Sequence, residues 1–267
     1  MKAVDLILKT LLNERKAKYS GGLYEKTQVD LAYNSNYIEG SRLSKDHTRQ
    51  LFETRSILAE NEVIYSDDII CANNHFRAFN YIIDHCSESL DTMFIKKVHR
   101  ILMSGTSMEN MGYPVGEYKS MTNYIDDNET APVDKIPEYM NLLLGKYNGK
   151  KQITFEDIVT FHSDFEHIHP FQDGNGRTGR ILMFRECLRN KIIPFIISDE
   201  NKMYYYNGLK NFEKNPTYLL ETCGEAQDNY TFFSCQLVKG FQNQAEKEKL
   251  IRPELQKYIS KRLGHGL

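Results

Sequence analysis

The chain has 267 residues, of which 40% are hydrophobic and 12% aromatic, enough to bury a sizeable core. Its 34 basic and 36 acidic residues leave a net charge of -2, which favours neither nucleic acid nor an anionic membrane surface as a partner. The five cysteines lie far apart without a C-x-x-C pair, so we expect reduced thiols rather than disulfides or a structural zinc site.

The first segment, MKAVDLILKTLLNERKAKY, has apolar residues near helical spacing, no small-residue cleavage site and no apolar run long enough to span a bilayer. We therefore expect a helix here and a cytoplasmic protein with no membrane contact. Apolar residues three and four apart predict further helices around 76–83 and 95–102. The matching end signals are Gly40 and Gly105, and the start signals are Ser44, Ser66, Asp91, Thr154 (with Asp157) and Ser198.

Two segments resemble strands. The stretch SMTNYID (120–126), between GYPVGEYK and DNETAP, indicates a hairpin, and IIPFII (192–197) is a short apolar run. No repeat, low-complexity stretch or long linker interrupts the chain. The sequence thus predicts one all-α domain with helical extensions, ending in a charged, solvated helix that frays within 242–267.

The segment HPFQDGNGRTGR (169–180) concentrates polar groups and glycines between two helical patterns. The upstream helix should end at His169, because a residue before proline disfavours the helical conformation. The downstream helix should begin after DGNG, where free backbone N–H groups and the helix dipole attract an anion. Gly174 and Gly176 would let a phosphate approach the backbone closely. The segment therefore predicts a phosphate site.

The charged side chains of this segment refine that prediction. Arg177 and Arg180 are neighbours on the first turns of the helix and can bind a polyphosphate. Asp173 suits a phosphate site only with a divalent cation between them, which indicates Mg²⁺. A neutral His169 at the entrance could take the proton of a hydroxyl that attacks phosphorus. Together they predict phosphoryl or nucleotidyl transfer from a nucleotide.

The same residues allow two other interpretations. GNGRTG matches the dinucleotide pattern G-x-G-x-x-G, with 192–197 as a following strand and Asp199 in a suitable place, but no strand is expected before it. A metal site from His162, His167 and His169 does not fit a helix, because residues five apart point in different directions. Packing or surface roles suit His162 and His167 better.

The segment 169–180 resembles the motif of the Fic family, H-P-F-x-[D/E]-G-N-G-R-x-x-R, at every specified position. The resemblance implies an all-helical Fic core over about 89–214, with an N-terminal helical region at 1–88 and a C-terminal extension at 215–267. It also implies transfer of AMP from ATP, with Mg²⁺ as cofactor, to a Ser, Thr or Tyr hydroxyl of a protein, including the chain itself. Pyrophosphate is the other product.

Each motif position takes a role from this resemblance. His169 would be the general base and Asp173 the Mg²⁺ ligand, with Phe171 as a packing anchor. The ATP-binding residues would be Gly174, Asn175 and Gly176 in the phosphate loop, Arg177 on the α- and β-phosphates, and Arg180 on the γ-phosphate.

Two more segments resemble parts of Fic proteins. GEYKSMTNYIDD (116–127) resembles the stretch leading into the flap, a hairpin at about 118–130 that covers the nucleotide and positions the target. Its working residues would be Asn123, Tyr124 and Ile125, since a free strand edge can hold an extended peptide. MYYYNGLK (203–210) would place Tyr205 and Tyr206 beside the adenine or ribose.

SNYIEG (35–40) resembles the inhibitory motif [S/T]-x-x-x-E-[G/N] of many Fic proteins. Ser35 and Glu39 share one face if the segment is helical, and Gly40 would close the helix. Glu39 could then pair with Arg180 and occupy the place of the γ-phosphate. The resemblance implies an enzyme restrained by its own N-terminal helix.

Other functions stay open at this point. Within the same fold, the chain could remove AMP from a modified protein, with Glu39 orienting a water, or transfer another phosphate-containing group. A non-catalytic nucleotide-sensing module and an NAD-binding oxidoreductase are more remote alternatives. The sequence also leaves a homo-oligomer open.

Overall fold

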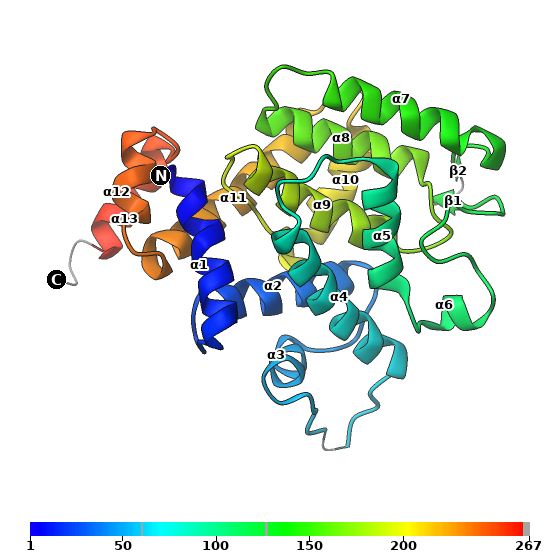
Figure 1. The fold of residues 1–267 in the computed structure, drawn as a ribbon, viewed down its shortest axis with the longest axis horizontal. Helices are drawn as coiled ribbons and strands as arrows, with labels where there is room; N and C mark the ends of the chain where they lie inside the picture. Colours follow the sequence, from blue (N-terminus) through cyan, green and yellow to red (C-terminus); the bar gives the residue numbers. More distant parts are fainter. Residues whose placement is uncertain (60, 126–127, 264–267) are drawn as a thin grey trace.

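A computed structural model describes residues 1–59, 61–125 and 128–263 and shows a mostly helical molecule with one small hairpin (Figure 1). The prediction of an all-α fold is confirmed. The α-helices are α1 (Ala3–Ala17), α2 (Leu23–Ile38), α3 (Lys45–Thr54), α4 (Ser66–Asp84), α5 (Thr92–Met103), α6 (Ser107–Asn110), α7 (Ile136–Asn148), α8 (Phe155–Ile168), α9 (Asn175–Arg189), α10 (Lys202–Asn211), α11 (Thr217–Leu237), α12 (Phe241–Lys247) and α13 (Pro253–Leu263). The strands are β1 (Tyr124–Ile125) and β2 (Asn128–Glu129), and short 3-10 helices lie at η1 (Val133–Lys135) and η2 (Asp199–Asn201).

Helix α9 lies at the centre, in contact with α1, α2, α4, α5 and α8. It is buried from Asn175 to Leu188, because apolar residues on several of its faces meet neighbouring helices. Arg185 is buried within it, and its guanidinium contacts Glu186 and the carbonyl oxygens of His85 and Glu88. A buried charge is stable only with such partners. The start of α9, where its free N–H groups lie, is therefore held rigidly.

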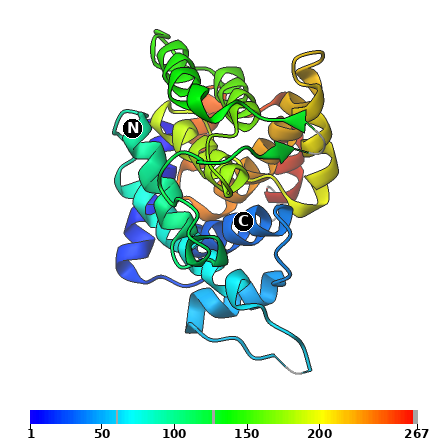
Figure 2. The same cartoon turned by 90° about the vertical axis from the view of Figure 1, so that its right-hand side faces the viewer.

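One hydrophobic cluster runs from Ala3 on α1 to Ile259 on α13. It takes residues from all three expected regions, 1–88, 89–214 and 215–267, so these regions share a core. The boundaries between them stay a prediction. At one end of the molecule α1 lies beside α12 and α13, as Figure 1 shows, and Figure 2 shows the hairpin crossing another face.

Most expected helix ends are confirmed. The side chains of Ser44 and Asp91 accept a backbone N–H three residues on, and Thr154 forms a capping box with Asp157. Gly40 and Gly105 follow α2 and α5 with positive φ of 98° and 77°, the conformation that closes a helix.

Two start signals and one end prediction differ from the structure. Ser66 is the first residue of α4, after its cap Tyr65, and Ser198 precedes η2 without a side-chain capping bond. The stretch expected as one solvated C-terminal helix forms α12 and α13, and Phe241 and Ile259 are wholly buried. The apolar side chains of α12 and α13 cover α1 and α11. In the sequence the many charged residues around these apolar positions hide this pattern. The expected fraying at 264–267 lies outside the described residues.

The hairpin prediction at 120–126 is confirmed in part. Strands β1 and β2 pair antiparallel, with Tyr124 opposite Glu129 and Ile125 opposite Asn128. Asp126 lies outside the described residues. The apolar run at 192–197 is not a strand but an irregular segment. The dinucleotide-binding interpretation is therefore wrong for this fold, because α8 precedes the glycine-rich loop and no strand follows α9 at that run.

Candidate active site

The imidazole of His169 lies where α8 ends and the glycine-rich loop begins. His169 is the C-cap of α8, with φ of 52°, and its Nδ1 lies 3.2 Å from the carbonyl oxygen of Glu166. That carbonyl only accepts, so Nδ1 carries the proton and Nε2 is left with a free lone pair. Burial lowers the pKa of His169 below its usual value of 6.5. The ring is thus neutral at pH 7 and can accept a proton at Nε2.

The loop 170–174 is fixed by its own side chains. Asn175 is 1% exposed, and its amide donates to the carbonyl oxygen of Phe171 (2.8 Å) while accepting from the Phe171 N–H (2.9 Å). Phe171 is wholly buried and stacks on His99, with ring centroids 3.7 Å apart. The expectation of Phe171 as a packing anchor is confirmed. Gly174 has φ of 77° and a Cβ there would collide with Met103, so the turn requires glycine.

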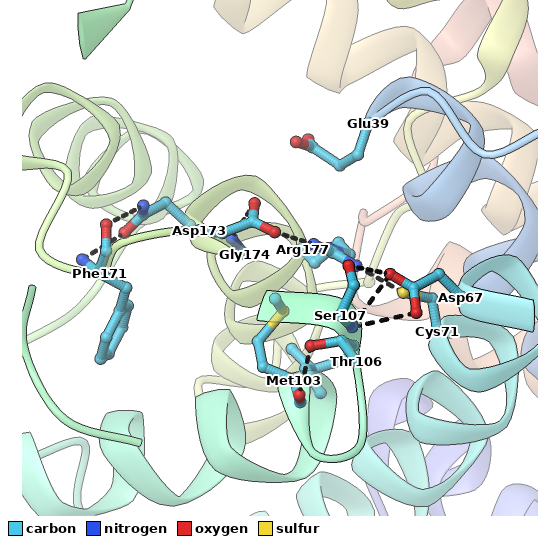
Figure 3. A network of polar contacts seen from close by, with 12 residues as sticks. Glu39, Asp67, Cys71, Met103, Thr106, Ser107, Phe171, Asp173, Gly174 and Arg177 are labelled. Atoms are coloured by element: carbon cyan, nitrogen blue, oxygen red, sulfur yellow. Dashed lines mark hydrogen bonds and ion pairs between the residues drawn. The ribbon is translucent and has the colours of Figure 1, made fainter. Parts of the chain in front are cut away.

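Arg177 lies beside Asp173, as Figure 3 shows. Its Nη2 donates to Asp173 Oδ2 (3.1 Å), and its Nη1 donates to the Sγ of Cys71 on α4 (2.9 Å). The Arg177 side chain is 8% exposed and its Nε has no partner among the described residues, whereas Asp173 is 40% exposed. A buried guanidinium with a free donor beside an accessible carboxylate suits an anionic ligand with a cation.

Arg180 is held by the end of α2, three residues further along α9. Its Nη2 donates to Glu39 Oε1 (2.7 Å) and to the carbonyl oxygen of Ser35 (2.9 Å), and its Nε donates to Ser35 Oγ (3.1 Å). A Cβ on Gly176 would overlap the Glu39 carboxylate, which therefore lies directly against the start of α9. Figure 3 shows Glu39 reaching from the end of α2 over the loop. The carboxylate thus lies between the start of α9 and the Arg180 guanidinium.

A buried polar chain extends from Arg180 away from Glu39. Arg180 Nη1 donates to the Tyr205 hydroxyl (3.4 Å), which lies 2.6 Å from His162 Nε2. Since the hydroxyl accepts from arginine, it donates to His162, whose Nδ1–H then lies 3.9 Å from Glu166 Oε1. Burial raises the pKa of Glu166 to about 8. These polar contacts fix the orientation of the Arg180 guanidinium on its side away from Glu39.

The two tyrosines expected near the adenine have different surroundings. Tyr205 is wholly buried with its hydroxyl toward Arg180, so its ring offers no free face to a base in this structure. Tyr206 is 39% exposed, and its hydroxyl donates to the carbonyl oxygen of Ile38 (3.0 Å), next to Glu39. Their place beside the adenine or ribose stays a prediction.

The hairpin is attached at its base to the loop 170–174. Asn123 donates to the carbonyl oxygen of Phe171 (2.9 Å), and the buried Lys119 donates through Nζ to Asn123 Oδ1 (2.7 Å) and through its backbone N–H to Pro170 (2.8 Å). Asn123 thus acts inside the protein, whereas Tyr124 is 62% and Ile125 41% exposed. Of the three expected flap residues, two present their side chains to solvent.

His162 and His167, which do not fit a metal site by their spacing, form hydrogen bonds within the protein. His162 is buried against Tyr205, and His167 lies 2.7 Å from the carbonyl oxygen of Ser163 on its own helix. No group of three His, Cys, Asp or Glu side chains suited to a metal occurs in residues 1–59, 61–125 and 128–263. Mg²⁺ nevertheless fits Asp173, because this ion commonly takes one or two carboxylates and completes its shell with phosphate oxygens and water.

His75, on α4, lies close to Arg177 and Arg180 of α9. It is wholly buried, and neither ring nitrogen has a hydrogen-bond partner among the described residues. Burial, then the charges of Arg180 and Arg177, lower its pKa to about 3. The unfolded chain binds a proton here below pH 6.5 and the folded chain does not, so stability falls by about 1.4 kcal/mol per pH unit below 6.5.

We expect His75→Leu to be more stable than the unaltered chain. Removing the unpartnered nitrogens should raise the free energy of unfolding by about 1 kcal/mol at pH 7, and by a further ~2 kcal/mol at pH 5 because the proton linkage disappears. Urea denaturation at both pH values measures this. The control is Thr178→Val, which removes a buried unpartnered hydroxyl that does not titrate. Thr178→Val should raise the free energy of unfolding by the same amount at both pH values. If the gain for His75→Leu were also the same at pH 5 and pH 7, the prediction would be contradicted.

Several residues at the site could not be selected from the sequence. Cys71, His75 and His99 lie on helices whose periodicity was clear, but nothing in the spacing distinguishes them from other core positions. Cys71 and Arg177 also line a pocket of about 190 Å³ with Glu39, Asp173 and Ser107. Asp67 also lines that pocket and accepts from the Ser107 N–H (3.0 Å), as seen in Figure 3.

The fold and site define a mostly helical protein with a glycine-rich loop at the start of α9 and a histidine at the rim of that loop. Residues 89–187 match the model of the Fic/DOC family. Over that segment the chain is similar to this family. It is 28% identical over 182 residues to a protein adenylyltransferase Fic of Nematostella vectensis and 26% identical over 191 residues to that of Aedes aegypti. These alignments cover 66% and 70% of the chain but only 41% and 37% of the relatives, so the chain spans less than half of their length.

Solved Fic structures share the fold. A Fic domain-containing signaling protein of Bacteroides thetaiotaomicron superposes with a TM-score of 0.64 at 23% identity, covering 92% of this chain and 97% of that one. Fic-1 of Caenorhabditis elegans (residues 134–508) gives a TM-score of 0.67 at 16% identity, covering 87% and 72%. Among the described residues, none of the helices combines the length and apolar character needed to cross a bilayer.

Proposed function

We propose that the chain is a protein adenylyltransferase that its own α2 holds inactive. The main support is the position of Glu39, whose carboxylate binds Arg180 and lies against Gly176, at the start of α9. An acid is tolerated there because the site is built for an anion. The names of the relatives, protein adenylyltransferases, support the phosphates of ATP as this anion.

In the proposed reaction, a Ser, Thr or Tyr hydroxyl of a target protein attacks the α-phosphorus of ATP. Nε2 of His169 accepts the hydroxyl proton as the new P–O bond forms, the bond between the α-phosphorus and the bridging oxygen breaks, and pyrophosphate leaves with the electron pair. The N–H groups of Gly174 to Gly176 and the guanidinium of Arg177 would hold the α- and β-phosphates, and Arg180 the γ-phosphate. Tyr124 and Ile125 would face the target.

Asp173 would hold Mg²⁺. When bound, the ion would neutralise phosphate charge and stabilise the leaving pyrophosphate. The accessible carboxylate of Asp173 lies beside Arg177, so the protein provides one acidic ligand next to the expected phosphates. Five free cysteines support placing the protein in the cytoplasm.

Glu39 would inhibit by occupying the place of the γ-phosphate. Three donors of Arg180 go to Ser35 and Glu39, so ATP would have to displace this pairing to bind productively. The end of α2 is also tied to α10 through Tyr206 and to η2, where Tyr33 donates to Asp199 (2.7 Å). Release of inhibition would therefore require α2 to move, or its C-terminal turn to open.

Intact-protein mass spectrometry after incubation with Mg-ATP tests this proposal. The Glu39→Gly chain should gain the mass of one or more AMP groups, and the unaltered chain far less. A loss of AMP from a previously modified protein would instead indicate the reverse reaction, with Glu39 orienting a water. An adduct of another mass would indicate transfer of a different group. Tight ATP binding without any adduct would instead indicate a nucleotide-sensing module.

A further inference from the structure

His99 on α5 contacts both segments that build the site. Its Nε2 lies 2.9 Å from the carbonyl oxygen of Asp173, and its Nδ1 accepts from the backbone N–H of Gly116 (2.9 Å). The ring is 1% exposed and stacks on Phe171 with an interplanar angle of 6°. One side chain therefore joins the catalytic loop to the stretch that leads into the hairpin.

The two hydrogen bonds fix a single form of the ring. The Gly116 N–H can only donate, so Nδ1 must be unprotonated, and the Asp173 carbonyl can only accept, so Nε2 must carry the proton. A protonated imidazolium would lose the bond to Gly116, and the other neutral tautomer would lose both bonds. Only the neutral Nε2–H form satisfies both partners.

Both segments lie tightly on the same face of α5. A Cβ on Gly116 would collide with Arg100, and one on Gly174 would collide with Met103. The Glu117 carboxylate is held by Lys96 (2.7 Å) and Arg100 (3.4 Å). The residues concerned on α5 are Lys96, His99, Arg100 and Met103, which share one helical face.

We propose that His99 is a positioning residue that holds Asp173 and the approach to the hairpin in a fixed relation. The bond to the Asp173 carbonyl sets the orientation of the carboxylate on the metal side, and the bond to Gly116 sets the segment that carries Lys119 and Asn123 on the target side. This inference rests on the proposed function. It adds that the phosphate side and the target side are aligned through one imidazole.

Two conservative substitutions of His99, made in the Glu39→Gly background, each remove one of its two hydrogen bonds and retain the other. His99→Gln places an amide N–H near Nε2 and retains the bond to Asp173, whereas His99→Asn places an oxygen near Nδ1 and retains the bond to Gly116. We expect His99→Asn to raise the Mg²⁺ concentration for half-maximal AMP transfer by about fivefold, the loss of roughly one hydrogen bond. His99→Gln should leave that concentration unchanged and lower the rate at saturating Mg-ATP by a similar factor.

Two measurements do not depend on turnover. Mn²⁺ titration in the presence of ADP, followed by electron paramagnetic resonance, should show weaker binding for His99→Asn and unchanged binding for His99→Gln. The ¹⁵N resonances of His99 in the labelled chain should report a protonated Nε2 and an unprotonated Nδ1 at neutral pH. His85→Gln, which changes a half-buried histidine just after α4, is the matched control and should change none of these readings.

Equal Mg²⁺ and Mn²⁺ dependence in the Asn and Gln variants, or a protonated Nδ1, would overturn the assignment of His99. Melting temperatures of the variants identify any general loss of folding, which would affect both substitutions alike and also count against a separate positioning role. If the Glu39→Gly parent transfers no AMP, the proposed function fails, whereas the Mn²⁺ and ¹⁵N results still decide the role of His99.

Discussion

Glu39→Gly is expected to raise AMP transfer roughly 10- to 100-fold over the unaltered chain. A hydrogen bond to a charged group contributes about 1.5–3 kcal/mol, and tenfold corresponds to 1.4 kcal/mol. The substitution removes this contact and frees Arg180 and the space against Gly176 for phosphate. Glu39 follows the last residue of α2, with φ of -83°, so the backbone there accepts glycine, while the buried Arg180 keeps its contacts to Ser35 and Tyr205. Incorporation of labelled AMP over time, with the chain itself as acceptor, measures the effect.

Graded variants show whether the charge pairing causes the inhibition. Glu39→Gln keeps an acceptor but loses the charge, so its gain should be intermediate. Ser35→Ala removes one of the two Ser35 contacts, because the carbonyl oxygen still accepts from Arg180, and its gain should be smaller still. Glu53→Gln, an exposed acid on α3, serves as control and should change nothing. A rate for Glu39→Gly equal to that of Glu53→Gln would exclude inhibition by Glu39.

His169→Ala in the Glu39→Gly background is expected to lower AMP transfer by roughly 10²- to 10⁴-fold, the usual contribution of a general base. The imidazole is neutral and its Nδ1 is committed to the Glu166 carbonyl, so Nε2 is the atom that loses its function. The labelled-ATP assay measures the rate, and calorimetric titration with a non-hydrolysable ATP analogue measures binding.

The binding measurement separates chemistry from structure. The phosphates are expected on α9 and its arginines, so the affinity for the analogue should change by less than about threefold, well under the energy of one hydrogen bond to a charged group. His167→Ala, two residues away and hydrogen-bonded to the Ser163 carbonyl of its own helix, is the control and should keep most of the activity. Transfer by His169→Ala at the parent rate would remove the general-base role, and a large loss of affinity would assign His169 to binding instead.

Local signals in the sequence predicted much of the fold. Apolar spacing indicated helices around Phe79 and Val98, and the capping residues Ser44, Asp91 and Thr154 marked true helix starts, because these effects act within a few residues. The helix start predicted from Ser66 was wrong by one residue, because serine also suits the first position of a helix. The run at 192–197 is apolar because it is buried beside α11, and burial alone does not require a strand.

The contact between Glu39 and Arg180 was also expected, although the residues lie 141 positions apart. Family resemblance supplied it, since no local rule links two distant segments. Family resemblance also suggested a place for Tyr205 beside the adenine or ribose, and that place stays a prediction. In this structure packing against α8 buries the ring and turns the hydroxyl toward Arg180 and His162.

By itself the sequence determined most of the helices, the turn at His169, and the glycines and charges at the start of α9, because backbone preferences and helix dipoles depend on neighbouring residues. Only the tertiary structure decided that Cys71 holds Arg177, that His99 joins Asp173 to Gly116, and that the Glu39 carboxylate lies against Gly176. Those contacts join α2, α4 and α5 to α9 and the loops beside it, and their geometry follows from how whole helices pack around a shared core.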